Sequence, residues 1–262
     1  MELNKIYCEN CLDTMSRMPD NFIDLTVTSP PYDNLRNYNG YVFDFESIAK
    51  ELFRVTKKGG VVVWVVGDAT INGSETGTSF SQALYFKEIG FNLDTMIYGK
   101  TGGMFCNNTS YPNIFEYMFI LSNGKKKVVN LIKDKKNKGF GKLYTSHARD
   151  KDGNQKYSPT KTLTPEYSYR ENIWFYDTGS GVSSDEISHK HPAIFPEDLV
   201  RDHINSWSNE GDLVYEPFTG SGTTLKMAHL LKRNWIGSEI SQEYCDIAQK
   251  RIQPYLDQQT LF

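Results

Sequence analysis

The sequence of 262 residues has few cysteines and lacks the long apolar runs that membrane spans require. It contains no stretch of about 18 consecutive apolar residues, which argues against a helix that crosses a bilayer. No basic segment followed by an apolar block stands at its start, so no secretory signal is visible and we expect a cytoplasmic protein. The cysteines show no pairing pattern, which agrees with a reducing compartment; they are Cys8, Cys11, Cys106 and Cys245.

Two further signatures are missing. Cys8 and Cys11 have the C-x-x-C spacing of a zinc site, but no second pair or nearby histidine cluster completes one. We therefore expect small buried thiols there and no metal. The glycine-rich segment near the end of the chain contains no Gly-Lys-[Ser/Thr], which excludes a phosphate-binding P-loop.

The net charge of only -3 gives little support for a chain that coats nucleic acid. Its distribution is uneven, because one segment holds eight lysines against the single Asp134: Lys125, Lys126, Lys127, Lys133, Lys135, Lys136, Lys138 and Lys142. Lysines that neutralise backbone phosphates release counterions, so this run is a candidate DNA contact. A solvated, mobile loop is an equally good interpretation.

Apolar periodicity predicts alternating strands and helices in most of the chain. Strands are expected at 6–8, 23–28, 61–66, 93–98, 115–121, 212–216 and 235–239, and helices at 12–18, 45–55, 79–89, 196–207, 223–233 and 241–252. The basic and glycine residues at 57–60 are expected to end the second of these helices. The alternation indicates an α/β fold with one open, mostly parallel, Rossmann-like sheet and helices on both faces.

Between about residues 123 and 188 the periodicity is weak. Such a stretch inside a compact domain is either a functional insertion or a disordered loop. Its many aromatic residues argue against simple disorder.

A glycine loop lies where the strand at 212–216 ends and the next helix begins. Gly220 and Gly222 allow a ligand to approach the backbone closely, and the start of the helix offers unpaired N–H groups to an anion. Glu239 stands 17 residues after Gly222, at the end of the next strand, where an acid can accept both hydroxyls of a ribose. A plain tight turn and a surface carboxylate are the alternative interpretations.

The segment Ser29-Pro30-Pro31-Tyr32 follows directly on the strand at 23–28. Its two prolines fix the chain and hold Ser29 in an extended conformation. At the end of a strand in an open sheet, the segment presents a serine hydroxyl and a proline carbonyl as adjacent acceptors, with an aromatic ring beside them. A stiff loop with a packed tyrosine is the alternative.

Together these segments resemble the DNA amino-methyltransferases. Thr28–Tyr32 resembles the catalytic motif of that family, and residues 216–224 (EPFTGSGTT) resemble its cofactor loop. Similar segments also occur at 57–60, 191–197 and 233–251. The order of the motifs matches the beta group, a circular permutation of the methyltransferase sheet. This implies a catalytic half at 1–124, an inserted target-recognition region at 125–185 and a cofactor-binding half at 186–262.

The resemblance implies a role for each matching residue. Ser29, Pro30, Pro31 and Tyr32 would form the catalytic motif, and S-adenosyl-L-methionine would be the cofactor. Its contacts would come from Asn10, Cys11, Thr28, Phe195, Glu216, Pro217, Phe218, Gly220, Ser221, Gly222, Thr223, Glu239 and Ile240. One departure concerns Asn10, because the family often has an aspartate there that contacts the adenine.

The implied reaction is a direct methyl transfer. The Ser29 hydroxyl and the Pro30 carbonyl would accept from the amino group of a base that has left the duplex, and Tyr32 would stack on that base. No cysteine follows a proline, which agrees with a mechanism without a covalent intermediate.

Serine at the first position of the motif is associated in the family mainly with cytosine N4, and aspartate with adenine N6. We therefore expect a site-specific cytosine-N4 methyltransferase of a prokaryote or phage that acts on double-stranded DNA, with adenine N6 as the alternative. A cognate restriction endonuclease and a homodimer stay open. Other candidates are a non-catalytic nucleic-acid-binding protein, a small-molecule or RNA methyltransferase, and a nicotinamide-dependent oxidoreductase.

Overall fold

The computed structural model describes residues 1–31, 43–101, 111–177 and 195–259. The chain divides into two compact units, one of Met1–Asn130 together with Asn172–Phe262 and one of Leu131–Glu171. None of the described helices is both long and apolar enough to cross a membrane.

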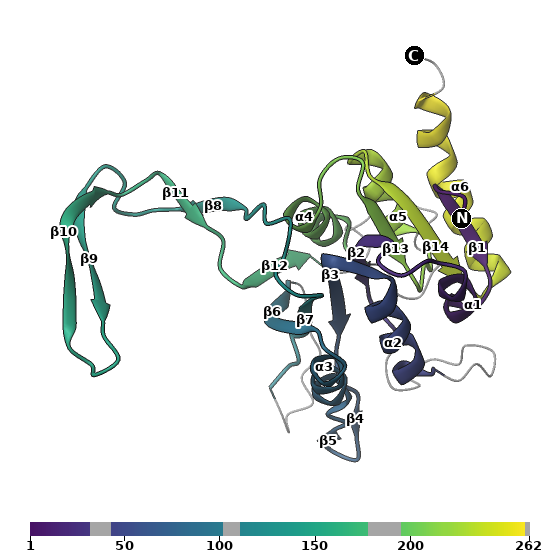
Figure 1. The fold of residues 1–262 in the computed structure, drawn as a ribbon, viewed down its shortest axis with the longest axis horizontal. Helices are drawn as coiled ribbons and strands as arrows, with labels where there is room; N and C mark the ends of the chain where they lie inside the picture. Colours follow the sequence, from purple (N-terminus) through teal and green to yellow (C-terminus); the bar gives the residue numbers. More distant parts are fainter. Residues whose placement is uncertain (32–42, 102–110, 178–194, 260–262) are drawn as a thin grey trace. The chain divides into compact units, whose positions relative to one another are not determined.

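The larger unit is built on an eight-stranded sheet with the strand order β1-β14-β13-β2-β3-β7-β6-β12 (Figure 1). These strands are β1 Lys5–Cys8, β2 Ile23–Thr28, β3 Thr56–Val66, β6 Asn92–Thr101, β7 Phe115–Ser122, β12 Ile173–Asp177, β13 Leu213–Glu216 and β14 Asn234–Glu239. Within this sheet only β7 runs against its neighbours β3 and β6, and every other pair is parallel. The expected open, mostly parallel sheet is confirmed.

Helices cover both faces of this sheet (Figure 1). On one face, α2 (Phe45–Val55) packs against α1 (Cys11–Ser16) and α3 (Thr78–Glu88). On the other face, α5 (Thr223–Leu230) packs against α4 (Glu197–Trp207) and α6 (Gln242–Gln259).

The apolar run in β3 explains how the two layers share one sheet. Val62, Trp64 and Val66 belong to the core cluster that includes α1, α2 and α3. Val61 and Val63 are equally buried, and they alternate with the first set, so they point toward the opposite layer. A strand that is buried on both faces reads as a continuous apolar run, as expected from the sequence.

The second helix does not end at residues 57–60 as expected. Helix α2 ends at Val55 with Arg54 as the basic residue of its last turn, and Thr56 is already extended. Residues 57–60 lie inside β3, where the register against β2 shifts between Ile23 and Leu25. Gly59 adopts a φ of 83° and exchanges backbone hydrogen bonds with Lys127 and Asn123. The positive φ of Gly59 therefore belongs to an irregularity within strand β3 and does not mark the end of a helix.

Other expected boundaries also differ. Helix α5 ends at Leu230, and not at residue 233, because Lys232 takes a φ of 60°. Helix α6 continues past Pro254 to Gln259, supported by side-chain bonds from Gln249 to Gln253 and from Gln253 to Asp257. Strand β12 and the small hairpin of β4 (Thr70–Ile71) and β5 (Ser74–Glu75) were not expected.

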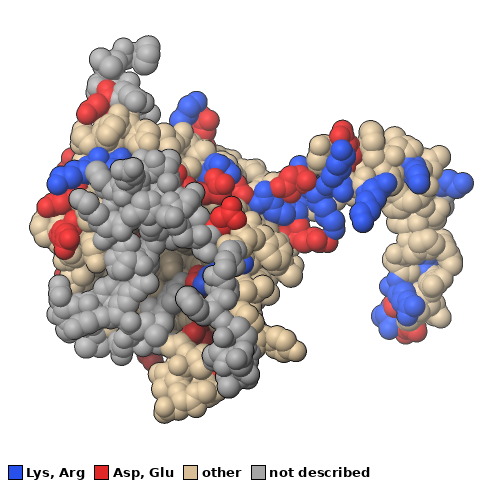
Figure 2. Space-filling view, turned by 180° about the vertical axis from the view of Figure 1, so that it is seen from behind, with Lys and Arg blue, Asp and Glu red and all other residues tan. Residues whose placement is uncertain are grey.

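The smaller unit consists of paired strands, so the weak periodicity of this stretch does not reflect disorder. β8 (Lys133–Lys136) pairs with β11 (Tyr167–Tyr169), and β9 (Leu143–Arg149) pairs with β10 (Gln155–Leu163), both antiparallel. Most of their described side chains are exposed, and Figure 2 shows Lys and Arg side chains spread over the surface of this unit. Since no described apolar residue of these strands is buried, alternation could not reveal them.

Candidate active site

The two sequence motifs meet at the carboxyl edge of the sheet. β13 ends at Glu216 and β2 ends at Thr28, and the two strands pair in parallel with Tyr215 opposite Thr26. From β13 the chain crosses to β14 on one side, whereas from β2 it crosses to β3 on the other. The strand order thus reverses between β13 and β2, and open α/β sheets bind ligands beyond the strand ends at such a point.

Glu216 joins the two motifs directly. The Thr28 hydroxyl donates to its Oε1 atom, which also accepts from the backbone N–H of Phe218 at 3.1 Å. The Thr224 hydroxyl donates to Oε2 at 2.8 Å. One carboxyl group therefore holds the end of β2, the cofactor loop and the first turn of α5 in a fixed arrangement.

The electrostatics of this edge favour a cationic ligand. Burial raises the pKa of Glu216 to about 8. Burial also raises the pKa of Glu239, although N–H groups of Ser241 and Gly220 oppose this. No described Lys, Arg or His forms a salt bridge with either carboxyl. Two buried acids without a cationic partner create a site where a positive charge is stabilised.

The glycine loop runs from Pro217 to Gly222 and is almost wholly buried. Gly222 has a φ of 81°, and a Cβ on it would lie 2.9 Å from the Cβ of Ala248 in α6. Gly220 has a φ of 50° and donates its N–H to Glu239 at 2.8 Å. Both glycines are thus required by the backbone, and the loop is tied to the end of β14.

Ser221 and Thr223, both expected to bind the cofactor, turn their side chains toward α6. The guanidinium of Arg251 donates to the Ser221 hydroxyl at 3.2 Å and to the Thr223 hydroxyl at 2.8 Å. It also donates to the Ser221 carbonyl at 3.1 Å. Arg251 thus holds the loop and the first residue of α5 against α6, and both residues stay predicted contacts of the cofactor.

A buried charge cluster stands behind this loop. Glu197, at the start of α4, pairs with Arg251 at 2.5 Å and with Lys226 of α5 at 3.0 Å. The side chain of Arg251 is 0% exposed and that of Lys226 is 1% exposed. Burial alone would raise the pKa of Glu197, but Lys226 and Arg251 hold it below its ordinary value. One carboxylate therefore neutralises two cations from two other helices.

Glu239 is buried and not a surface carboxylate. Its two oxygens each accept one backbone N–H, from Gly220 at 2.8 Å and from Ser241 at 2.9 Å. A carboxylate oxygen has two lone-pair directions, so each oxygen keeps one for a ribose hydroxyl. The neighbouring Ile240 is 48% exposed, which leaves its side chain available to cover a ligand.

The turn between β1 and α1 lies at the same edge, because Cys8 pairs with Glu239. The side-chain oxygen of Asn10 accepts from Leu12 N at 2.9 Å and caps α1. Cys11 is buried, and burial raises the pKa of its thiol to about 12. Cys8 is exposed, so the expectation of a buried thiol there is wrong; β1 is an edge strand with a neighbour on one side only.

The predicted catalytic motif begins at this edge, but the structure describes only part of it. Ser29 is partly buried, Pro30 is buried and Pro31 is partly buried, directly after β2. Tyr32 lies outside the described residues. Phe218 packs against Phe43 and Trp64 with ring centroids 5.7 and 6.2 Å apart, so it joins the core as well as the loop. Phe195 is partly buried just before α4, and Pro217 is buried.

The lysine run is divided between the two units. Lys125, Lys126 and Lys127 belong to the larger unit, where Lys126 pairs with Asp94 and lies 5.5 Å from the Trp207 ring. The other five are exposed in the smaller unit: Lys133, Lys135, Lys136, Lys138 and Lys142. Lys133 lies over the Tyr169 ring, and Lys135 pairs with Glu171. Three of the eight thus already have an internal partner.

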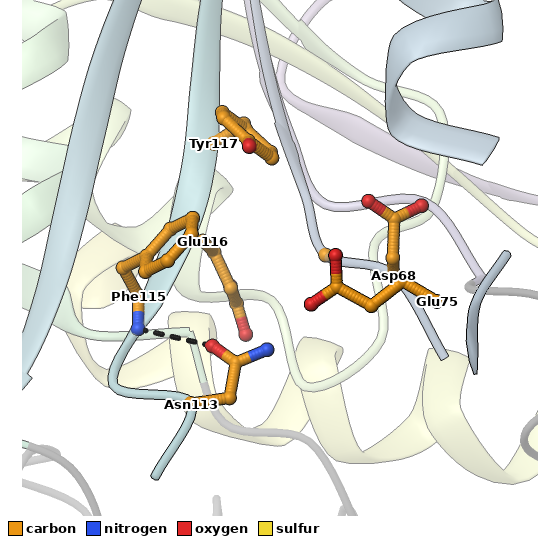
Figure 3. A pocket seen from close by; sticks show the side chains of 7 residues that line it. Asp68, Glu75, Asn113, Phe115, Glu116 and Tyr117 are labelled. Carbon is orange, nitrogen blue, oxygen red and sulfur yellow. Dashed lines mark hydrogen bonds between the residues drawn. The ribbon is translucent and has the colours of Figure 1, made fainter. Parts of the chain in front are cut away.

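A pocket opens farther along the same edge, beyond β3 and at the start of β7 (Figure 3). Asp68 is in its lining, but its oxygens accept from the N–H of Ser79 at 2.9 Å and support the start of α3. Glu116 in the lining pairs with Lys100 at 2.6 Å. No group of three or more potential metal ligands occurs among the described residues. None of the predicted site residues lines this pocket.

Four residues that contribute to the site were not predicted from the sequence. Thr224 and the Glu197–Arg251 pair were not named individually, although both members of the pair lie in segments that resemble the family. Lys226 gave no signal, because a lysine in a helix is normally an exposed residue.

The class of protein defined by this edge is an α/β enzyme that binds its ligand beside a glycine loop and two buried acids. A sequence model of the DNA methylase family matches residues 23–250. The chain therefore belongs to the DNA methylases of the N6/N4 type, as the motifs indicated. It is an enzyme of this family, with DNA as its substrate and S-adenosylmethionine as its methyl donor.

Relatives and solved structures agree with this assignment. The chain is 59% identical over 238 residues to the orphan methyltransferase M.BamHII of Bacillus amyloliquefaciens, covering 89% of this chain and 90% of that protein. It is 28% identical to the type II methyltransferase M.BglII of Bacillus subtilis, covering 94% and 68%. The PvuII DNA methyltransferase (cytosine-N4-specific) has the same fold, with a TM-score of 0.69, 18% identity and coverage of 97% and 91%. A putative DNA modification methylase of Thermus thermophilus, complexed with S-adenosyl-L-methionine, superposes with a TM-score of 0.66 and 19% identity over 96% and 93%.

Proposed function

We propose that the protein methylates the exocyclic N4 of cytosine at a specific sequence in double-stranded DNA. The observation that carries the proposal is the bond from Thr28 to Glu216. It fixes the segment that begins with Ser29 beside the glycine loop at the point where the strand order reverses. The methyl acceptor and the methyl donor are thereby brought to one edge of the sheet.

The glycine loop and its neighbours would hold S-adenosylmethionine. Glu239 keeps lone pairs for the ribose hydroxyls, and the glycines at 220 and 222 let the ligand approach the backbone closely. A sulfonium beside the buried Glu216 would stabilise the ionised form of this carboxyl against its raised pKa, and Phe218, Phe195 and Ile240 would supply apolar contact. The cofactor supplies the activated methyl group. The side-chain oxygen of Asn10 accepts from Leu12 N at the start of α1. Only the second lone pair of this oxygen would be left to accept from the adenine amino group.

The residues that contact the methyl acceptor would act by orienting the amino group of the base. The amino nitrogen of cytosine is a weak nucleophile because its lone pair is delocalised into the ring. The Ser29 hydroxyl and the Pro30 carbonyl would accept from its two N–H groups and turn the lone pair toward the methyl group. Positioning and electrostatic stabilisation then lower the barrier.

Serine at position 29 supports cytosine as the target, because a hydroxyl can accept from the amino group and also donate to the neighbouring ring nitrogen. The PvuII DNA methyltransferase, which has the same fold, is cytosine-N4-specific, and this agrees with the choice. The test is to express the chain in a host without DNA methylation and to sequence the DNA by a method that separates N4-methylcytosine from N6-methyladenine. We expect N4-methylcytosine at one short sequence. N6-methyladenine alone would overturn the choice of base, and an unmodified genome would overturn the function.

The Ser29→Ala variant sharpens this experiment. It should abolish the mark and leave binding of S-adenosylmethionine, measured by calorimetry, within about twofold, because the hydroxyl contacts the base and not the donor. Phe80→Ala, an exposed residue on α3, is the control and should keep the mark. A fully active Ser29→Ala enzyme would remove Ser29 from the mechanism.

DNA contact is assigned to the region 125–185, between the two halves of the methyltransferase domain at 1–124 and 186–262. Its exposed lysines would neutralise phosphates, so binding should weaken steeply as salt rises. Lys136, Lys138 and Lys142 form no salt bridge with a described carboxylate and are the first candidates. Replacing these three by alanine should reduce the salt dependence, with slope changes near one unit per contact.

Partner proteins form the last part of the proposal. A relative's description as an orphan methyltransferase supports action without a restriction endonuclease, whereas the type II names of others support a cognate one. Digesting the methylated host DNA with endonucleases that recognise the mapped sequence would reveal which cleavage the mark blocks. Sedimentation of the purified enzyme with and without DNA would show whether it is a homodimer.

A further inference from the structure

The hairpin of β9 and β10 is a two-stranded ribbon without a covering layer among the described residues. Leu143, Tyr157 and Leu163 are 64%, 60% and 57% exposed, although apolar and aromatic side chains on a strand normally pack on a core. An isolated two-stranded ribbon is at best marginally stable in water. The ribbon therefore has the features of a binding surface.

The two faces of the ribbon differ in chemistry. Residues that pair across an antiparallel ribbon share a face. On one face the pairs are Arg149 with Gln155, His147 with Tyr157, Thr145 with Lys161, and Leu143 with Leu163. On the other face Ala148 pairs with Lys156, and Tyr144 with Thr162. Hydrogen-bonding groups with long reach are thus concentrated on the first face, which we call the Arg149 face.

Side-chain contacts order this face. The rings of His147 and Tyr157 meet edge to face with centroids 4.7 Å apart. The Tyr157 hydroxyl donates to the side-chain oxygen of Gln155 at 2.5 Å, which leaves the amide nitrogen of Gln155 directed elsewhere. At the tip, Asp150 accepts from the N–H groups of Asp152 and Asn154, and this fixes the turn.

The net charge of the smaller unit indicates which kind of molecule the ribbon binds. The unit Leu131–Glu171 contains ten Lys and Arg against five Asp and Glu, a net charge of +5 in a chain whose total is -3. Arg149, Lys156 and Lys161 form no salt bridge with a described carboxylate. The positive charge of this unit is complementary to the phosphates of DNA, whereas two such ribbons from two copies of the chain would repel each other.

We propose that the ribbon enters the major groove of DNA and reads base edges with the Arg149 face. The major groove is about 12 Å wide and admits a two-stranded ribbon. Arginine binds guanine through two hydrogen bonds, and glutamine and lysine also reach base edges there. The side chains of the other face, with Lys156, point toward the groove wall and its phosphates. This inference rests on the proposed function, because it names the residues that select the methylated sequence.

A matched pair of variants tests it. Arg149→Ala and Lys156→Ala each remove one positive charge from neighbouring cross-strand pairs on opposite faces. Methylation rates are measured on a duplex with the sequence found in host DNA and on duplexes with one changed base pair. Arg149→Ala should lower the rate on the correct duplex about tenfold or more and reduce discrimination at one base pair. Lys156→Ala should lower all rates by a similar, smaller factor and keep the discrimination.

Arg149→Lys guards against an effect on folding, since it keeps the charge but loses the planar fork of donors. It should keep the affinity for random-sequence duplex DNA and still lose discrimination. Equal behaviour of the Arg149 and Lys156 variants would overturn the inference. So would a change in oligomeric state with unchanged discrimination, which would make the face a contact between two copies. If the wild-type enzyme methylates DNA, the proposed function holds. Any of these outcomes then counts against the inference about the ribbon alone.

Discussion

Thr28 donates a hydrogen bond to Glu216 across 188 residues of sequence. Thr28 is the last residue of β2, immediately before Ser29, and Glu216 is the last residue of β13, immediately before the glycine loop. The bond therefore links the two motifs that define the family. In a permuted chain, where these motifs lie far apart in sequence, this side-chain contact sets the distance between them.

A double-mutant cycle on this pair measures the link. Thr28→Val keeps the volume and removes the hydroxyl, and Glu216→Gln keeps the shape and replaces the carboxyl by an amide that does not titrate. We expect Thr28→Val to lower the free energy of unfolding by about 1–3 kcal/mol, the cost of an unmade buried bond. Urea unfolding of both single variants and the double variant should give a coupling of about 1 kcal/mol or more. Thr28→Ser should restore most of the loss. A coupling near zero would mean that the two groups do not interact.

The raised pKa of Glu216 predicts how stability depends on pH. With a pKa of about 8 against an ordinary 4.5, the folded chain retains a proton that the unfolded chain has lost. The unfolding free energy should therefore fall as pH rises from about 5 to 8, by at most about 1.4 kcal/mol per unit from this group. Glu216→Gln should flatten that slope, whereas Glu243→Gln, on the exposed first turn of α6, should not. An unchanged slope in Glu216→Gln would show that another group carries it.

Most of this fold was predictable from the sequence, because burial dictates patterns of residues. The run at 61–66 could only be a strand covered on both faces, and Phe45–Val55 has one apolar helical face. The strands of the smaller unit were missed, since exposed strands carry no alternation. Strand β12 was missed because apolar side chains occupy its exposed positions as well as its buried one. The glycines at 59 and 60 looked like a helix end, but their backbone serves a shift in strand register.

The site could be predicted in part for the same reason. The motifs named the loop and Glu239, because glycine is needed where the backbone is crowded. Sequence could not show that Ser221 and Thr223 point toward Arg251, since the direction of a side chain depends on which helix packs behind it. Nor could it reveal that Lys226 is buried, because only the packing of α4 against α5 places Glu197 within reach.

Glu239 offers a test of cofactor recognition. Glu239→Gln retains an oxygen for a backbone N–H but loses the charged acceptor for the ribose hydroxyls. Calorimetry should show weaker binding of S-adenosylmethionine by about tenfold or more, since hydrogen bonds to charged groups contribute about 1.5–3 kcal/mol. Adenine and methionine fragments without a ribose should bind both proteins equally. Glu243→Gln is the control, and equal affinity in Glu239→Gln would place the ribose elsewhere.

The buried cluster of Glu197, Lys226 and Arg251 predicts a large and asymmetric effect on stability. Glu197→Gln removes the carboxylate that pairs with two buried cations, and breaking a buried ion pair costs about 3–5 kcal/mol. Asp198→Asn, at the next position, removes an equal charge from a side chain that is 62% exposed and should cost less than about 1 kcal/mol.

Because Lys226 and Arg251 hold the pKa of Glu197 below its ordinary value, the native state favours the ionised form. Its contribution is present above pH 4.5 and is lost as pH falls through the lowered pKa. Adding Lys226→Met to Glu197→Gln should recover part of the stability, since an apolar side chain of similar length replaces one of the two buried cations. Urea unfolding at about pH 7 gives the free energy of unfolding of four proteins. They are the wild type, Glu197→Gln, Asp198→Asn and the double variant with Lys226→Met. A Glu197→Gln variant as stable as Asp198→Asn would show that the cluster does not support the loop.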